Sequence, residues 1–240
     1  MKIDGITLDE NNLEFNNAAA FVKHTDKLIY LTGKAGTGKT TFLKFIKQNT
    51  AKNTVILAPT GIAAINAGGV TINSFFQIPF GPFVPNDSRL RTSSSGTENK
   101  ETIYTTFRYR EEKTQIIKNL ELLIIDEISM VRCDTIDVID RILKVFRKKP
   151  HQSFGGVQVI LIGDTFQLPP IADNEQWTIL RQFYKTPFFF SSHTINSETP
   201  TYIELKKIFN LDFTIYPKKK VIFVSNDHTV FFNSNVRQTT

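Results

Sequence analysis

The sequence predicts an α/β fold with a mostly parallel β-sheet that carries helices on both faces. Short apolar runs alternate along the chain with stretches of helical periodicity, which is the pattern of repeated strand–helix units. Several apolar runs stop abruptly at glycine or acidic residues, as strands do where a parallel sheet places its ligand-binding loops. The 240 residues, 40% of them hydrophobic, suffice for one large domain.

The composition points to the cell interior and to a phosphate-bearing partner. The net charge of +6 favours nucleic acid, although a merely basic protein is the alternative. A single cysteine, Cys133, excludes an internal disulfide and a cysteine-rich metal site. Residues 1–17 show no secretory signal, and no run is long enough to span a membrane, so we expect a cytoplasmic protein, nucleoid-associated in a bacterium, without a membrane partner.

Residues 9–24 have the spacing of a leading helix. Its apolar face is predicted to consist of Leu13, Ala18, Phe21 and Val22. The asparagines near its start, Asn12 among them, are interpreted as capping residues, with contact to a nucleotide base as the alternative.

A glycine-rich loop follows the first predicted strand. The apolar run 28–31 leads into residues 33–40, which complete the pattern G-x-x-x-x-G-K-[ST], and a helix follows. Such a loop closes backbone N–H groups around phosphates, Lys39 reaches the β- and γ-phosphates, and the Thr40 hydroxyl ligates Mg²⁺. The predicted nucleotide contacts are Gly33, Ala35, Gly36, Thr37, Gly38, Lys39, Thr40 and Thr41. A chance glycine-rich turn is the alternative.

The second predicted strand, residues 55–58, also ends in a candidate binding loop. A short helix over 62–67 and the segment 70–76 come next. The candidates for contact with phosphodiester oxygens are Thr60, Gly61 and Ser74. Phe75 or Phe76 is a candidate for stacking on a base, or both belong to the core.

Residues 80–114 lose the periodic pattern. Their prolines, glycines and serines predict an inserted surface loop. Its arginines fit a nucleic-acid path or an ordinary solvated loop equally well.

The apolar run 122–125 is predicted to be a central strand that ends in Asp126 and Glu127. At the same edge as the phosphate loop, Asp126 would hold the Mg²⁺ water shell, and Glu127 would position and deprotonate the water that attacks the γ-phosphate. Two acids that only cap a helix are the alternative.

The remaining chain completes the alternation. An amphipathic helix over 135–149 is followed by a buried strand over 157–162, and 188–190 and 202–205 are read as further strands. After the strand at 157–162, Gln167 is placed to sense the γ-phosphate, and Asp164 to support Gln167 or the metal shell.

Four segments together resemble the ordered motifs of the petite-integration-frequency (PIF) helicases of superfamily 1B. They are GKAGTGKT at 33–40, APTGIAA at 58–64, IDEISM at 125–130, and FGG at 154–156 with GDTFQLPP at 163–170. The resemblance implies a RecA-like P-loop ATPase domain over 1–209 that uses ATP and Mg²⁺ and moves 5′ to 3′ on single-stranded DNA. It makes Lys39, Glu127 and Gln167 catalytic, assigns the metal to Thr40 and Asp126, and puts Thr60, Gly61, Ser74 and Phe75 in the DNA-facing motif.

The chain departs from the family pattern at two places. Asn73 stands where members tend to have histidine, and Asn210-Leu211 stand where an Arg-Gln pair is expected. Because two later motifs are not found, residues 210–240 are predicted to be a fragmentary remnant of the second helicase domain. We therefore expect a truncated motor that binds Mg-ATP and DNA but unwinds poorly or not at all, unless another chain supplies the second domain. A nucleotide-dependent DNA-binding module and an inactive remnant are the alternatives; a small-molecule kinase is disfavoured because no acceptor-site lid is evident.

Overall fold

A computed structural model of the chain describes residues 2–3, 6–7, 12–93 and 101–206. Within this part, a six-stranded sheet runs in the order β5-β4-β6-β7-β3-β8, and each neighbouring pair is parallel. The predicted mostly parallel α/β fold is therefore confirmed.

The sheet contains β3 (Ile29–Thr32), β4 (Thr54–Ala58), β5 (Val70–Thr71), β6 (Leu122–Ile125), β7 (Gln158–Ile162) and β8 (Thr201–Glu204). A separate antiparallel pair joins β1 (Lys2–Ile3) to β2 (Ile6–Thr7). Every residue of β6 and β7 is buried, because these central strands are covered on both faces. The order places β7 between β3, which precedes the glycine loop, and β6, which precedes the two acids.

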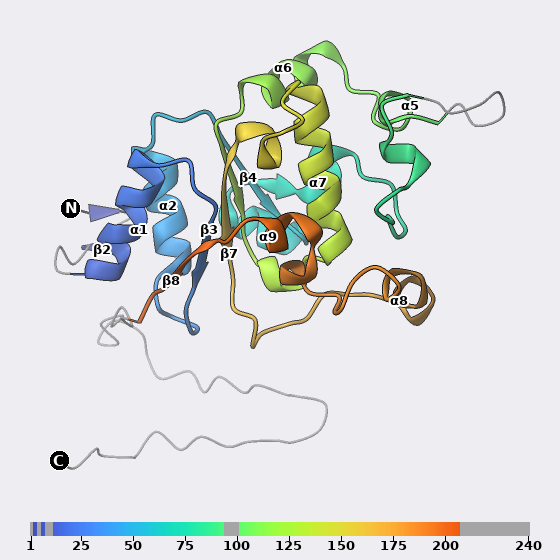
Figure 1. Cartoon of the computed structure of the whole chain (residues 1–240). Helices are drawn as coiled ribbons and strands as arrows, with labels where there is room; N and C mark the ends of the chain where they lie inside the picture. Colours follow the sequence, from blue (N-terminus) through green and yellow to red (C-terminus); the bar gives the residue numbers. More distant parts are fainter. Residues whose placement is uncertain (1, 4–5, 8–11, 94–100, 207–240) are drawn as a thin grey trace. The chain divides into compact units, whose positions relative to one another are not determined.

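The helices are α1 (Leu13–His24), α2 (Lys39–Asn49), α3 (Gly61–Ala67), α4 (Ile72–Phe76), α5 (Ile103–Thr106), α6 (Glu111–Asn119), α7 (Cys133–Phe146), α8 (Asn174–Leu180) and α9 (His193–Ser197). In the described part of the chain, four 3₁₀ turns accompany them: η1 (Ser88–Leu90), η2 (Ile128–Met130), η3 (Ser153–Gly156) and η4 (Phe189–Ser191). Figure 1 shows α1 and α2 together on one side of the sheet, with α7 and α9 on the other.

The start of α1 confirms one prediction and corrects another. The Asn12 side chain accepts a hydrogen bond from the backbone N–H of Phe15 at 3.1 Å, so Asn12 caps the helix. Leu13, predicted to lie on the apolar face, is 66% exposed. Phe15 is buried instead, and its ring contacts those of Phe42 and Phe45 on α2. The apolar face of α1 thus follows the spacing of Phe15 and not that of Leu13.

The prediction of an unpatterned loop over residues 80–114 is wrong for much of the segment. Its described parts contain η1, α5 and the start of α6, while residues 94–100 lie outside the described chain. Phe83, Leu90 and Phe107 are buried in the main core. The helices are too short to show a 3.6-residue period, so the sequence carries no clear signal for them.

The predicted strand at 188–190 is also wrong. These residues form mainly the 3₁₀ turn η4, and only Phe188 pairs with another backbone segment, in a single bridge to Arg132. Phe189 is buried, and the rings of Phe188 and Phe190 stack 5.3 Å apart. An aromatic run favours strand and core equally in sequence, and here tertiary packing decides.

Helix α7 begins two residues before the predicted start, and η3 docks against it near its end. The backbone N–H of Phe154 donates to the Asp140 carboxylate at 2.6 Å. Gly155 has a φ of +59°, and a Cβ there would lie 2.5 Å from the carbonyl oxygen of Leu143. Only glycine therefore permits this approach, which leads the chain into β7.

The domain predicted over 1–209 is described from residue 2 to residue 206 with the gaps stated above, and the predicted remnant over 210–240 lies outside the described residues. In the part of the chain that is described, no helix combines the length and the hydropathy that crossing a membrane requires.

Candidate functional site

The glycine loop between β3 and α2 adopts a backbone that side chains would not allow. Gly33, Gly36 and Gly38 have φ angles of 149°, 82° and 96°. A Cβ on Gly33 would lie 2.4 Å from Thr37 Oγ1 and 2.6 Å from the carbonyl oxygen of Leu205. The loop is thus packed against the end of β8, and it turns directly into α2.

Lys39, the first residue of α2, points back into this loop. Its Nζ donates to the carbonyl oxygens of Gly33 at 2.5 Å and of Lys34 at 3.2 Å. Thr37, which is buried, donates its hydroxyl to the same Lys34 carbonyl at 2.8 Å. The first N–H groups of a helix have no partner within the helix, so the loop joins an ammonium group to the positive end of the α2 dipole. Thr40 follows with an exposed side chain. This arrangement suits an anion.

The two acids follow the fully buried strand β6. The backbone N–H of Asp126 donates to the carbonyl oxygen of Leu57 in the neighbouring strand at 2.8 Å. The Asp126 carboxylate accepts the N–H of Glu127 at 3.0 Å. Glu127 has φ 50° and ψ 44°, a left-handed conformation that is unusual for a residue other than glycine. Such backbone strain is characteristic of functional sites.

Electrostatics link these acids to the glycine loop. Burial raises the pKa of Asp126 to about 6, and the Glu127 charge acts in the same direction. The N–H of Glu127 and the Lys39 ammonium oppose that rise in the pKa of Asp126. Because β3, β7 and β6 are adjacent and parallel, the loop after β3 and the acids after β6 lie at one edge of the sheet, as predicted.

Gln167 belongs to the loop that leaves β7, the strand between β3 and β6. The Gln167 side chain donates from Nε2 to Asp164 Oδ2 at 3.4 Å, and its backbone N–H donates to the Asp164 carbonyl at 3.0 Å. This contact agrees with the first role considered for Asp164, the support of Gln167, and the second role, in the metal shell, stays a prediction. Three adjacent strands thus bring Lys39, Glu127 and Gln167 to one edge.

The donor set at this edge fits Mg²⁺. Among the described residues, no three His, Cys, Asp or Glu side chains converge to hold a metal by themselves. Mg²⁺ does not need such a cage, because it keeps several waters and is held by one or two carboxylates together with substrate phosphates. The Asp126 carboxylate and the Thr40 hydroxyl are hard oxygen donors of that kind.

The residues predicted to face DNA lie beyond β4 and on α4. The Thr60 hydroxyl accepts the N–H of Ala63 at 3.2 Å and so caps α3, which begins at Gly61. Ser74 is exposed on α4. Thr60 and Asn73 line a pocket of about 350 Å³, beside the 95% exposed ring of Phe80.

Base stacking by Phe75 requires a correction. The residue is only 6% exposed, and its ring contacts that of Phe76 edge-on at 4.8 Å. Lys113 Nζ lies 3.2 Å from the ring centroid, and burial lowers the pKa of this lysine to about 8. Both phenylalanines therefore belong to the core, which was the alternative to stacking.

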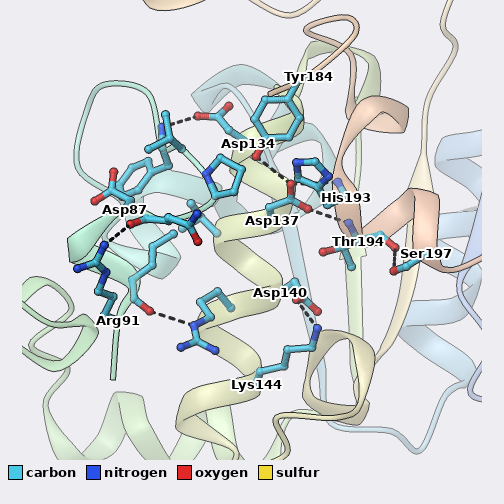
Figure 2. Close-up of a pocket in the computed structure, with 17 residues that line it drawn as sticks. Asp87, Arg91, Asp134, Asp137, Asp140, Lys144, Tyr184, His193, Thr194 and Ser197 are labelled. Atoms are coloured by element: carbon cyan, nitrogen blue, oxygen red, sulfur yellow. Dashed lines mark hydrogen bonds and ion pairs between the residues drawn. The ribbon is translucent and has the colours of Figure 1, made fainter. Parts of the chain in front are cut away.

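A larger pocket, of about 560 Å³, lies along α7 (Figure 2). Its carboxylates are already engaged. Asp137 accepts the Tyr184 hydroxyl and the Thr194 N–H, both at 2.9 Å, and Asp140 pairs with Lys144 at 2.7 Å. The bonds of Asp137 tie Tyr184 and α9 to α7, and Asp140 also accepts the Phe154 N–H of η3, so these acids have structural roles.

Sequence reasoning missed two features near the site. The first is the ion pair of Arg132 with Asp134, which joins α7 to the loop at residues 81–83. The second is an exposed apolar rim after β7 and before α8. Its members are Phe166, Leu168 and Ile171. The only signal for this rim was the run of apolar residues within a predicted loop.

Known proteins match the chain across most of its length. The model of the family described as PIF1-like helicase matches residues 8–207. The ATP-dependent DNA helicase PIF1 of Saccharomyces cerevisiae is 34% identical over 186 residues, which are 75% of this chain and 19% of that protein. The ATP-dependent DNA helicase PIF6 of Trypanosoma brucei brucei is 37% identical over 161 residues, which are 64% of this chain and 18% of that protein.

Solved structures give the same result. Bacteroides Pif1 bound to ssDNA is 43% identical with a TM-score of 0.71, and Bacteroides sp Pif1 in complex with ADP-AlF4 is 43% identical with a TM-score of 0.72. Each match covers 85% of this chain and 43% of the solved chain. The chain thus spans about a fifth of these curated relatives and less than half of the solved chains, and its sheet is that of a RecA-like helicase domain. The chain belongs to the PIF1-like helicase family.

Proposed function

We propose that this chain is the nucleotide-binding motor domain of an ATP-dependent DNA helicase that moves 5′ to 3′ on single-stranded DNA. One observation carries the proposal. Lys39, Glu127 and Gln167 leave three adjacent parallel strands at one edge of the sheet, and the Lys39 ammonium acts on the neighbouring Asp126. This is the set of groups that binding and hydrolysis of a nucleoside triphosphate require.

In the proposed reaction, the loop N–H groups and Lys39 hold the β- and γ-phosphates, and Lys39 exchanges its bonds to the loop carbonyls for phosphate oxygens. Thr40 and Asp126 would hold Mg²⁺, which when bound withdraws charge from the phosphate oxygens. Glu127 orients the attacking water and accepts its proton. The Gln167 amide, braced by Asp164, contacts the γ-phosphate and responds to its loss.

Single-stranded DNA is the proposed partner. Two of the solved relatives are described as bound to ssDNA. The net charge of +6 favours a phosphate backbone, and Gly61 and Ser74 are exposed beside the pocket that Thr60 lines. Contacts there would bind the phosphates of the strand and would not depend on the DNA sequence.

Turnover by residues 1–240 alone is proposed to be slow. An arginine that approaches the γ-phosphate contributes about 10³–10⁵ to the rate in related phosphoryl-transfer sites. Asn210 stands where the family resemblance places that arginine. We therefore expect single-stranded DNA to stimulate ATP hydrolysis by this chain while the rate stays low. An arginine supplied by another chain should raise the rate of hydrolysis further.

Phosphate release from Mg-ATP, measured with and without an oligo-dT strand, tests this function. The proposal predicts slow hydrolysis that the strand stimulates and that Lys39→Ala abolishes. Nucleotide-dependent DNA binding without any turnover would instead support a binding module. If Lys39→Ala still binds and hydrolyses the nucleotide like the wild type, the assignment of the site is wrong.

A further inference from the structure

The guanidinium of Arg132, which follows Glu127 by five residues in the chain, makes a planar pair with a buried carboxylate. Arg132 precedes α7, and its side chain is 13% exposed. Its Nε and Nη2 donate to the two oxygens of Asp134 at 2.6 Å and 2.8 Å. The Asp134 side chain is fully buried, so this two-bond pair is well shielded from water.

The same guanidinium joins two further segments. Its Nη2 donates to the carbonyl oxygen of Gly81 at 2.8 Å, and its Nη1 donates to the Gln176 side chain on α8. Asp134 also accepts the backbone N–H of Phe83 at 2.9 Å (Figure 2 shows the Asp134 carboxylate). The loop at 81–83, the start of α7 and α8 therefore meet at one side chain.

A short buried turn connects this junction to the acids. The N–H of Met130 donates to the carbonyl oxygen of Glu127 at 3.0 Å, which closes the turn η2. Ile128 within it is fully buried, and its N lies 2.9 Å from where a Cβ on Gly163 would stand. Ile128 and Ser129 are fully buried in this turn, so it has little room to absorb a displacement of Arg132 on the way to Glu127.

The junction also borders the proposed DNA face. Arg132, Gly81 and Gln176 line the pocket of about 350 Å³ that Thr60 also lines. Because Thr60 shares this pocket with Gly81 and Gln176, a strand that contacts Thr60 would lie beside the loop and α8, both of which Arg132 holds.

We propose that Arg132 is a positioning residue that couples nucleic acid on this face to the geometry of Asp126 and Glu127. The inference rests on the proposed function, because it assumes that the chain binds both Mg-nucleotide and DNA. Arginine is required because lysine cannot make the two-bond pair with Asp134 and reach the other two acceptors in one plane.

The test measures the coupling between the two ligands and needs no turnover. The affinity of the full chain for a fluorescein-labelled oligo-dT strand is determined by anisotropy with and without Mg-AMP-PNP. Coupling free energies of this kind usually change affinity by about 5- to 150-fold. We expect Arg132→Lys to reduce the wild-type ratio to within about twofold of unity, while the affinity for Mg-AMP-PNP alone stays within about twofold of wild type.

Arg89→Lys is the matched control. Arg89 also pairs through two bonds with an aspartate, Asp87, and it contacts the same 81–83 loop through the Pro82 carbonyl oxygen and the Phe83 ring. In the described chain it does not contact α8 or the residues next to η2, so it tests whether loosening the loop alone changes the coupling. It should keep the wild-type coupling ratio. Gln176→Leu removes only the contact of Arg132 with α8 and should lower the ratio at least about threefold, whereas Gln176→Glu keeps the acceptor and should preserve it.

Each outcome decides a question. Wild-type coupling in both Arg132→Lys and Gln176→Leu overturns the inference and leaves the proposed function intact. If the wild-type chain binds both ligands but neither changes the affinity for the other, the inference is also overturned and the proposed function stands. A wild-type chain that binds no Mg-AMP-PNP overturns the proposed function and the inference together. If Arg132→Lys does not fold, the comparison of Gln176→Leu with Gln176→Glu carries the test.

Discussion

At the scale of single residues, the proposed reaction depends most on Glu127. Its left-handed backbone conformation and the bond from its N–H to Asp126 fix its position at the end of β6. Replacing it with glutamine keeps the size and removes the proton acceptor, which contributes about 10²–10⁴ to the rate of such reactions. We expect Glu127→Gln to bind Mg-nucleotide normally in calorimetry and to lose hydrolysis by at least about a hundredfold in phosphate-release assays.

The exposed residue Glu112 on α6 supplies the control for this experiment. Glu112→Gln should hydrolyse ATP like the wild type. Unchanged turnover in Glu127→Gln would show that another group accepts the proton.

The buried Asp126 carboxylate should make the stability of the fold depend on pH. Its pKa is raised by burial from 3.8 to about 6 in the folded chain. The contribution of Asp126 to the free energy of unfolding is therefore fully present below pH 4 and is lost as the pH rises through 6, because the charged carboxylate is disfavoured in the folded state. A shift of one pKa unit corresponds to about 1.4 kcal/mol, so the charged Asp126 lowers the stability at pH 8 by at most about 3 kcal/mol. Access of solvent to the carboxylate should reduce this loss to about 1–2 kcal/mol.

Without magnesium and nucleotide, Asp126→Asn should accordingly be more stable than the wild type at pH 8 by about 1–2 kcal/mol, and equally stable at pH 4. Urea unfolding at the two pH values measures this difference. A variant that is less stable at pH 8, or a difference that does not change with pH, would contradict the assigned burial of the charge.

At the scale of elements, the buried strands and the glycine loop were predictable, because continuous apolar runs and a fixed glycine spacing are local signals. The helices within 80–114 were not, since Phe83 and Phe107 reach the core through contacts distant in sequence. The aromatic run at 188–190 was misread for the same reason. In the candidate site, the residue types predicted Lys39 and Glu127, but only the packing shows that Phe75 is enclosed.

The docking of η3 on α7 yields a prediction for an element. Gly155 combines a positive φ with a Cβ position 2.5 Å from the Leu143 carbonyl oxygen. Gly155→Ala should lower the free energy of unfolding by about 2–4 kcal/mol, from backbone strain and overpacking together. Gly61→Ala is the control, because nothing lies within 4 Å of a Cβ there, and it should change stability by less than about 1 kcal/mol. Equal effects in urea unfolding would refute the proposed fit of η3.

At the scale of the whole molecule, the parallel sheet gathers groups that are far apart in sequence. The strand order puts β7 between β3 and β6, so the glycine loop, the acids and Gln167 meet at one edge although more than a hundred residues separate the first from the last. The chain spans less than half of the solved chains it matches, and the residues of the proposed nucleotide site all lie within it. Nucleotide binding is accordingly the central claim.

Calorimetric titration of the chain with Mg-AMP-PNP tests this claim most directly. Lys34→Ala serves as the control, since Lys34 is exposed in the same loop. We predict a one-to-one complex in the wild type and in Lys34→Ala, and a loss of affinity of at least about 10- to 100-fold in Lys39→Ala, as expected for a charged hydrogen-bond donor. No binding by the wild type, or equal binding by Lys39→Ala, would contradict the account.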